Sequence, residues 1–215
     1  MMYKISMTDN YNKICQDYKN VSRETYEKLE KYVELVLKWQ KSVNLISKNT
    51  IGQIWERHIC DSVQLINVID TSKTKFFDIG SGAGFPGIVI AILLSELNPS
   101  AVVELVESDM KKCLFLREVK RQLGLNIIVT NERIEKLDDS KYEIITTRAL
   151  ASLDKLFNYV HRFCDVDTKL IFPKGESFES ELEEAQANWK FDYKIEQSKT
   201  NDKAVMLIIS NLHNQ

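Results

Sequence analysis

The ten residues Asp78-Ile79-Gly80-Ser81-Gly82-Ala83-Gly84-Phe85-Pro86-Gly87 decide how this sequence is interpreted. The stretch begins inside a strand-like run at residues 75–79 and is followed by the longest purely apolar run of the chain, residues 88–94. Glycine lets a backbone approach a ligand closely and adopt conformations that other residues reach only at a cost. Proline suits the first position of a helix. The stretch therefore predicts a strand, a ligand-binding loop and a buried helix of an open α/β sheet.

Beyond this loop, short apolar strands alternate with helical stretches, which is typical of parallel βαβ units. The predicted strands are 75–79, 101–106, 126–130, 142–147 and 169–172, and the predicted helices are 86–97, 109–123, 152–164 and 176–188. Two further strand-like runs, 191–197 and 204–210, are expected to form a hairpin around Thr200-Asn201-Asp202. Five parallel strands completed by an antiparallel hairpin favour a Rossmann-like class I methyltransferase sheet flanked by helices. A dehydrogenase domain more often ends in a sixth parallel strand.

The first 70 residues lack this alternation and are expected to form a helical N-terminal extension that packs on the core. Ser22 can cap a helix whose apolar residues recur at helical spacing until about Trp39. Thr50 and Gln53 form a candidate capping box for a second helix. The predicted organisation is an extension at residues 1–70 and a methyltransferase core at residues 71–215 that is one structural unit.

Asp78 indicates which ligand the glycine loop prefers. Because Gly82, Gly84 and Gly87 also match the GxGxxG pattern, a dinucleotide-binding protein is the alternative. A carboxylate just before the first glycine repels a pyrophosphate and attracts a cationic, amino-acid-like ligand. S-adenosylmethionine carries an ammonium and a sulfonium and no phosphate. It is therefore the expected cofactor, with Asp78, Gly80 and Gly82 at its site.

Glu107 ends the second predicted strand, where a carboxylate can accept two hydrogen bonds from a ribose diol. The alternative is a solvated acid at the start of a loop. Because NAD-binding proteins use an acid in the same way, Glu107 indicates a nucleoside without identifying it. Asp109 is interpreted as a helix N-cap, and Lys111 and Lys112 as part of a solvated helix face.

The composition is that of a folded domain without a membrane or metal signature. The chain has 215 residues, of which 44% are hydrophobic and 28% charged, with a net charge of −2 and a pI near 6.0. This balance argues against binding nucleic acid through bulk charge. The longest apolar run is too short to cross a bilayer, and residues 1–10 show no secretory signal, so a cytoplasmic location is expected. The cysteines, which lack a CxxC pair or zinc-ligand spacing and are interpreted as reduced, are Cys15, Cys60, Cys113 and Cys164.

Several short motifs, taken in order, resemble one protein family. They are Leu37-Lys38-Trp39, Asn44-Leu45, Arg57-His58-Ile59-Cys60-Asp61-Ser62, the glycine loop through Gly87, Thr147-Arg148-Ala149 and Lys174-Gly175. From about Tyr26 to Gly175 the sequence is similar to the bacterial RsmG (GidB) family, the 16S ribosomal RNA guanine-N7 methyltransferases. Relatives often have Asp in place of Glu107 and Ser in place of Thr147, and both differences are chemically mild. Beyond Gly175 the similarity fades.

The resemblance implies transfer of the methyl group of S-adenosylmethionine to N7 of a specific guanine in the decoding region of 16S rRNA. The cofactor contacts that it implies are Gly80, Phe85, Ile134, Glu135 and Arg148. The residues expected near the RNA are Arg57, His58, Arg133 and Lys174. The expected partner is 16S rRNA within the small ribosomal subunit or its precursor, and the expected enzyme is a monomer without a metal.

Methyl transfer to guanine N7 needs no general base, because neutral guanine already presents a lone pair there. Catalysis is then mostly positioning, which can supply up to roughly 7–11 kcal/mol in favourable cases. For Arg57, the alternative to RNA binding is an i, i+4 ion pair with Asp61 on a surface helix. A small-molecule methyltransferase and a dinucleotide-binding protein remain the alternative functions. The acidic balance predicts weak binding to naked RNA and recognition of a folded ribonucleoprotein surface.

Overall fold

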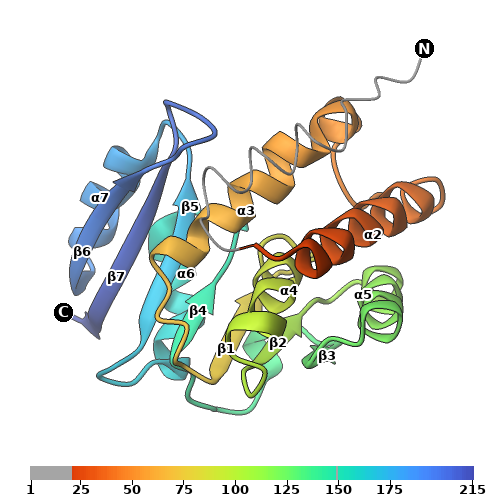
Figure 1. Ribbon diagram of the computed structural model, residues 1–215. Coiled ribbons are helices and arrows are strands. Elements are labelled where there is room, and N and C mark those ends of the chain that lie inside the picture. The colour runs from red at the N-terminus through yellow and green to blue at the C-terminus, as the bar shows by residue number, and fades with distance from the viewer. Residues whose placement is uncertain (1–20, 149) are drawn as a thin grey trace.

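The computed structural model describes residues 21–148 and 150–215, and within them a seven-stranded sheet has the strand order β3-β2-β1-β4-β5-β7-β6 (Figure 1). Strands β1 to β5 are parallel, whereas β7 runs antiparallel to both β5 and β6. The strands are β1 Lys75–Ile79, β2 Val102–Val106, β3 Ile127–Thr130, β4 Ile144–Thr146, β5 Lys169–Lys174, β6 Trp189–Gln197 and β7 Val205–Asn214. The predicted fold, five parallel strands completed by an antiparallel hairpin, is confirmed.

Helices cover both faces of the sheet. The α-helices are α2 Arg23–Trp39, α3 Asp61–Val63, α4 Gly87–Leu97, α5 Met110–Leu123, α6 Leu153–Val160 and α7 Phe178–Gln186. Because side chains alternate along a strand, Phe76 and Ile144 face the layer that contains α2, α4 and α5. Phe77 and Ile145 face the opposite layer, which contains α6 and α7 (Figure 1). The strand ends that carry the glycine loop lie between these two layers.

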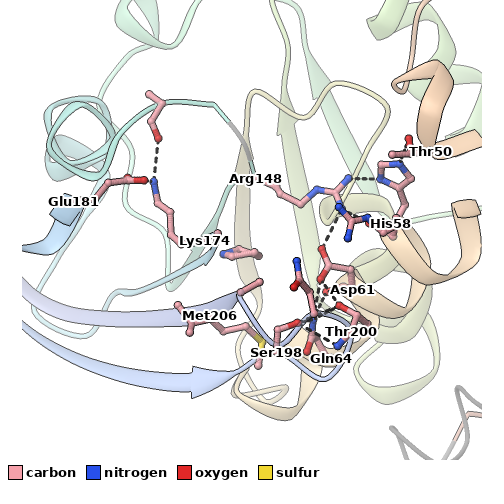
Figure 2. A pocket seen from close by; sticks show the side chains of 17 residues that line it. Thr50, His58, Asp61, Gln64, Arg148, Lys174, Glu181, Ser198, Thr200 and Met206 are labelled. Atoms are coloured by element: carbon pink, nitrogen blue, oxygen red, sulfur yellow. Dashed lines mark hydrogen bonds and ion pairs between the residues drawn. The ribbon is translucent and has the colours of Figure 1, made fainter. Parts of the chain in front are cut away.

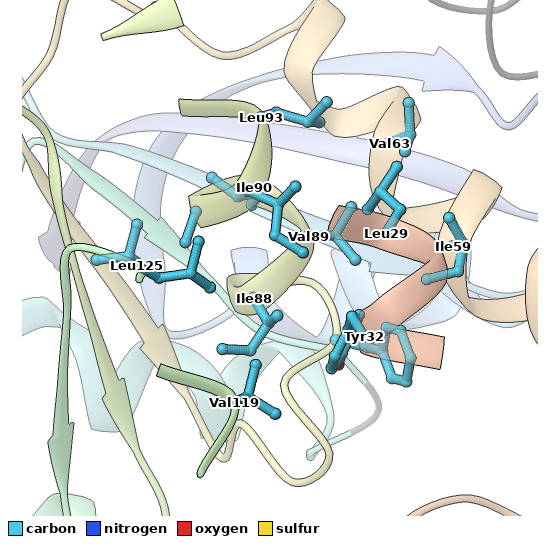
Figure 3. Close-up of a cluster of buried hydrophobic side chains, with 14 of the residues drawn as sticks. Leu29, Tyr32, Ile59, Val63, Ile88, Val89, Ile90, Leu93, Val119 and Leu125 are labelled. Atoms are coloured by element: carbon cyan, nitrogen blue, oxygen red, sulfur yellow. The ribbon is translucent and has the colours of Figure 1, made fainter. Parts of the chain in front are cut away.

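Helix α2 belongs to the same buried cluster as the sheet. Its residues Leu29 and Tyr32 are fully buried and lie near Ile88 and Val89 of α4 (Figure 3). Helix α4 is apolar on nearly every side because the sheet covers one face and α2 the other. Residues of the N-terminal extension therefore help to bury the helix that follows the glycine loop.

The local helix signals were only partly correct. The Ser22 hydroxyl accepts the backbone N–H of Thr25 at 3.1 Å, and Asp109 caps α5, as predicted. Pro86 is the N-cap of α4 rather than its first helical residue. Strand β4 is shorter than the predicted 142–147, because Thr147 turns its hydroxyl to the carbonyl of Ile79 at 2.9 Å.

The predicted capping box of Thr50 and Gln53 does not form. Residues Lys48–Gln53 form a 3₁₀-helix, Trp55–Cys60 a π-helical segment and Gln64–Asn67 another 3₁₀-turn around α3. The Thr50 hydroxyl instead donates to the Ser47 carbonyl at 2.9 Å and contacts the ring of His58. The sequence pattern failed here because the hydroxyl has a tertiary partner.

The cysteine and membrane expectations can be compared with part of the chain only. Cys60, Cys113 and Cys164 are free thiols, as predicted, whereas Cys15 and the segment 1–10 lie outside the described residues. Within residues 21–148 and 150–215, no helix is long and apolar enough to span a membrane. In the same part of the chain, His, Cys, Asp and Glu residues do not gather in groups that could hold a metal ion.

Candidate functional site

The glycine loop turns at the end of β1 through residues with positive φ. Gly80, Gly82 and Gly84 have φ values of 63°, 58° and 94°, which residues with a Cβ rarely adopt. At Gly84 a Cβ would also lie only 2.3 Å from Cγ1 of Ile88. Glycine is therefore required at Gly84 both by its backbone conformation and by its closeness to α4.

A cavity of about 370 Å³ opens beside the loop and is called here the glycine-loop cavity. It lies at the carboxyl ends of parallel strands, where open α/β sheets bind ligands. Its lining residues come from the loop, the end of β2, the segments after β3 and β4, and helices α5 and α6: Gly80, Gly82, Val106, Glu107, Ser108, Lys112, Glu132, Arg133, Ile134, Glu135, Arg148, Leu150 and Tyr159. Six of the eight predicted cofactor residues line it.

Glu107 holds the loop against β2 and still faces this cavity. Its Oε2 accepts the backbone N–H of Gly82 at 2.8 Å, and its Oε1 accepts that of Asp109 at 2.8 Å. Because each carboxylate oxygen can accept about two hydrogen bonds, one acceptor position on each oxygen is left. That pair of positions matches two neighbouring hydroxyl groups.

Asp78 is buried beneath the loop and does not line the cavity. The sheet register places it beside Thr146, whose hydroxyl donates to Oδ1 at 2.7 Å. Oδ2 faces the backbone of Gly87 without a hydrogen bond of ordinary geometry. Burial raises the pKa of the Asp78 carboxyl to about 6. Its negative charge therefore acts on the cavity from below and not by contact.

Arg148 connects the core to the N-terminal extension. Its Nη1 donates to Oδ2 of Asp61 at 3.2 Å and to the carbonyl of Arg57 at 3.1 Å, and its Nη2 lies 2.6 Å from Nδ1 of His58. The guanidinium also lies over the ring of Phe85, 5.4 Å from its centroid. Of the five N–H groups of a guanidinium, the Nε hydrogen and one Nη2 hydrogen have no partner within the described part of the chain.

His58 is neutral in this arrangement. A guanidinium only donates, so Nδ1 of His58 must accept from Arg148, and the proton resides on Nε2, 2.9 Å from the Thr50 hydroxyl. Burial, followed by the charges of Arg148 and Arg57, lowers the pKa of His58 to about 4. The ring of Phe85 stacks on the imidazole at 4.9 Å. Phe85 is therefore part of the support beneath His58 and Arg148, and it lines neither cavity.

A second cavity, of about 410 Å³, lies between the extension and the hairpin and is called here the hairpin cavity (Figure 2). It shares Arg148 with the glycine-loop cavity. Its lining residues are Thr50, Arg57, His58, Asp61, Gln64, Arg148, Ala151, Pro173, Lys174, Gly175, Glu181, Ser198, Thr200, Asn201, Ala204, Val205 and Met206. Positively and negatively charged side chains therefore line the same hairpin cavity.

Three of the four predicted RNA residues meet at this cavity, but not as isolated cations. Lys174 pairs with Oε2 of Glu181 at 2.7 Å on the side opposite Arg148 (Figure 2). Arg57 is exposed, and the ion pair with Asp61 that was the alternative to RNA binding does not form, because Asp61 binds Arg148 instead. The fourth residue, Arg133, lines the glycine-loop cavity.

Some residues of the site could not be found from the sequence. The Tyr32 hydroxyl donates to the carbonyl of Ala83 at 2.6 Å and so fixes the glycine loop from α2. Thr200 binds Asp61, and Gln64, three positions after Asp61, binds both Asp61 and the distant Ser198. Lys112, interpreted as part of a solvated face, lines the glycine-loop cavity. Short sequence patterns do not predict these contacts. Each contact joins segments that are distant in sequence or depends on the direction of a side chain.

The strand order, the glycine loop after β1 and the acid after β2 define a class I methyltransferase fold. The solved structure of a SAM-dependent methyltransferase from Aquifex aeolicus is similar to it, with a TM-score of 0.55 and 15% sequence identity, covering 74% of this chain and 92% of that chain.

The chain belongs to the GidB family, described as rRNA small subunit methyltransferase G, which matches residues 25–207. It is 40% identical to the ribosomal RNA small subunit methyltransferase G of Jannaschia sp. (strain CCS1), covering 90% of this chain and 92% of the relative. It is 44% identical to the protein of that name from Rickettsia felis, covering 89% and 96%. The resemblance found in the motifs is thereby confirmed, whereas the expectation that similarity fades beyond Gly175 is wrong, because the family match continues to residue 207.

Proposed function

We propose that this chain transfers the methyl group of S-adenosylmethionine to N7 of a guanine in the decoding region of 16S ribosomal RNA. The carrying observation is membership in the rRNA small subunit methyltransferase G family over residues 25–207. Two neighbouring cavities that share Arg148 support it, because methyl transfer needs two ligands side by side.

The residues of the glycine-loop cavity fit S-adenosylmethionine. Gly80 and Gly82 leave room for a ligand against the backbone, and the open acceptor positions of Glu107 suit a ribose diol. Ile134 offers an apolar side chain to an adenine ring, beside Glu135. When bound, the cofactor supplies an electrophilic methyl group on a sulfonium.

The hairpin cavity is the proposed site of the acceptor guanine. A base that is to be methylated at N7 must be unpaired or splayed out of its stack. Arg148 has two unused N–H groups at the boundary of the cavities. It cannot form the common bidentate contact with O6 and N7 of guanine, because the N7 lone pair must face the methyl group. Arg148 therefore contacts O6 alone or the cofactor carboxylate.

Charge development favours the same placement. N7-methylguanine is cationic, so positive charge grows on the base as the methyl group moves. Asp61 and Glu181, which line the hairpin cavity, are paired with Arg148 and Lys174, so they offset two cations that would otherwise oppose such a charge. His58 stays neutral next to Arg148 and adds no opposing charge. No residue has to remove a proton, so these groups act by position and charge.

The substrate is proposed to be a ribonucleoprotein surface and the enzyme a cytoplasmic monomer. A chain of net charge −2 gains little from bulk attraction to RNA. Specific docking on a small subunit or its precursor can supply the affinity that charge does not. We further propose that residues 1–70 and 71–215 work as extension and core of one unit.

The test is labelled methyl transfer to small ribosomal subunits from cells that lack the enzyme, followed by chemical cleavage at N7-methylguanine. Label is expected at one guanine. Arg148→Ala should abolish it, while Arg121→Ala, which removes an exposed arginine paired with Glu118, should not. Absence of label in RNA from an enzyme that binds S-adenosylhomocysteine would reject this substrate.

Cofactor choice is tested separately by thermal stability. A ligand at about 100 times its Kd stabilises the folded state by ~2.7 kcal/mol, which corresponds to roughly 5–10 °C for a domain of this size. S-adenosylhomocysteine should produce such a shift and NAD should not. The reverse result would favour the dinucleotide-binding alternative.

A further inference from the structure

The turn between β6 and β7 is bound to the N-terminal extension by a network centred on Asp61. Oδ1 of Asp61 accepts hydrogen bonds from the Thr200 hydroxyl at 2.8 Å and from Nε2 of Gln64 at 3.0 Å. Oδ2 of the same carboxylate accepts from Arg148 at 3.2 Å. One carboxylate thus divides its two oxygens between the hairpin and the arginine that separates the cavities (Figure 2).

Gln64 fixes the turn on this carboxylate. Its side chain is almost fully buried, and both ends of the amide are used. Nε2 donates to the Ser198 hydroxyl at 3.1 Å, and Oε1 accepts the backbone N–H of Lys199 at 2.9 Å. Thr200 also donates its backbone N–H to Ser198 at 3.2 Å. The position of the Thr200 hydroxyl is therefore set by the fold and not by its own rotamer alone.

Arg148 depends on these neighbours for its direction. It follows a strand of three residues, β4, and stands in the loop after it. Within the described residues its polar contacts are Asp61, the Arg57 carbonyl and His58, all from the extension. A charged hydrogen bond to Asp61 is the strongest type among them. A carboxylate that rotates freely would leave Arg148 with two contacts instead of three.

We propose that Thr200 is a positioning residue for methyl transfer: its hydroxyl fixes the Asp61 carboxylate, which in turn holds Arg148 at the boundary between the glycine-loop cavity and the hairpin cavity. This inference rests on the proposed function for its catalytic consequence, but not for its structural part. It gives the C-terminal hairpin a role in the reaction. It also makes the reaction sensitive to a residue that need not touch the cofactor or the base.

The structural part is tested by NMR on His58, whose Nδ1 faces Arg148. Because its pKa is about 4, the imidazole of the wild-type protein stays mostly neutral between pH 7 and pH 5. Thr200→Val keeps the shape of the side chain and removes the hydroxyl, so Arg148 should move away and the pKa of His58 should rise, while burial still holds it below its ordinary value. Thr200→Ser restores the hydroxyl and should behave as the wild type. Lys203→Ala, on the exposed part of the same turn, is the matched control and should change nothing.

The catalytic part is tested with small ribosomal subunits as the acceptor. Because small displacements of positioning groups can cost up to about 100-fold in rate, Thr200→Val should lower kcat by roughly 10-fold or more. The KM for S-adenosylmethionine should change less than kcat, since Gly80, Gly82 and Glu107 keep their places in the glycine-loop cavity and only Arg148 moves. Thr200→Ser should recover kcat. If Thr200 only stabilised the fold, Thr200→Val would lower the melting temperature without lowering kcat more than it changes the KM.

Three results would overturn the proposal. They are an unchanged pKa of His58 in Thr200→Val, a Thr200→Ser protein that behaves as Thr200→Val, and an unchanged kcat in Thr200→Val. A wild-type protein that methylates no small-subunit RNA would reject the proposed function instead. The His58 titration would still decide whether Thr200 holds Arg148, so the two failures are distinguishable.

Discussion

Replacing Tyr32 by Phe should weaken the glycine loop from a distance. The Tyr32 hydroxyl donates to the Ala83 carbonyl at 2.6 Å, and the side chain is fully buried. Phe keeps the ring contacts with Phe85 at 5.2 Å and with Phe115 at 6.5 Å, so only the hydrogen bond is lost. A buried carbonyl left without its donor costs about 1–3 kcal/mol. At 2–4 °C per kcal/mol, the melting temperature should fall by roughly 2–12 °C.

The assay combines thermal unfolding with calorimetric titration of S-adenosylhomocysteine. Because Ala83 lies between Gly82 and Gly84, cofactor affinity should fall along with stability. Tyr193→Phe is the control, since Tyr193 lies on the edge strand β6 with 45% of its surface exposed. Equal melting temperatures and equal affinities for the wild type and Tyr32→Phe would show that the hydroxyl contributes nothing and would refute the reasoning.

Three further predictions concern the site and its supports. Glu107→Gln places an amide where two backbone N–H groups are accepted, and it should weaken S-adenosylhomocysteine binding by roughly 10- to 100-fold in calorimetry; Glu183→Gln, on α7, should leave it unchanged. Gly84→Ala brings a Cβ to 2.3 Å from Ile88 at a φ of 94° and should destabilise the fold by about 2–4 kcal/mol in urea unfolding, unlike Gly52→Ala, whose Cβ meets nothing within 4 Å. Because the folded-state pKa of His58 is about 4, below its ordinary value, the unfolded state binds more protons between pH 6.5 and 4. The free energy of unfolding should therefore fall as the pH falls through that window, and less steeply in His58→Gln; equal slopes for both proteins would contradict the shifted pKa.

Buried Asp78 opposes His58 over part of the same range. Its folded-state pKa of about 6 lies above the ordinary value of 3.8, so the folded state binds more protons between these limits. Asp78 therefore favours stability at low pH and loses that contribution as the pH rises toward 6. Because the two slopes have opposite signs, only a comparison of variants separates them.

The core of the fold and the glycine-loop cavity followed from the sequence because their signals are local. Glycines at fixed spacing, an acid at the end of β2 and alternating strands and helices all lie within short segments. The residues from Gly80 to Glu107 span one βαβ unit, so the parallel pairing of its strands places both at the same sheet edge. Local patterns therefore sufficed to predict Gly80, Gly82 and Glu107, whereas Ile134, Glu135 and Arg148 followed only from the family resemblance.

The hairpin cavity did not follow from the sequence, because it is built by distant contacts. Thr200 and Asp61 are separated by 139 positions, and Gln64 and Ser198 by 134. The partner that the sequence offered for Asp61 as one alternative was the nearby Arg57, yet the structure pairs Asp61 with Arg148. A short-range ion pair on an exposed helix gains little. A less exposed site with several donors gains more, so the tertiary partner prevails.

Asp78 places a negative charge near the glycine-loop cavity, but its side chain does not line that cavity. The sequence argument placed its carboxylate at the ligand, whereas the structure encloses it beneath the loop beside Thr146. Strand alternation explains the difference, because a residue within β1 must point to one face of the sheet and cannot point along the strand end. Gly80 and Gly82, which come after the strand, are free of that constraint and line the cavity.

The N-terminal extension contributes structure that the core cannot replace. Tyr32 fixes the loop through Ala83, and the partners of Arg148 all come from residues 57–61. Removing residues 21–70 would also expose Ile88 and Val89 of α4, at about 1.5–3 kcal/mol for each buried side chain. Together this is about 3–6 kcal/mol, a large part of the ~5–15 kcal/mol by which native domains are stable, so a core that begins at residue 71 should be strongly destabilised. The reaction therefore depends on the extension twice, for the stability of α4 and for the direction of Arg148.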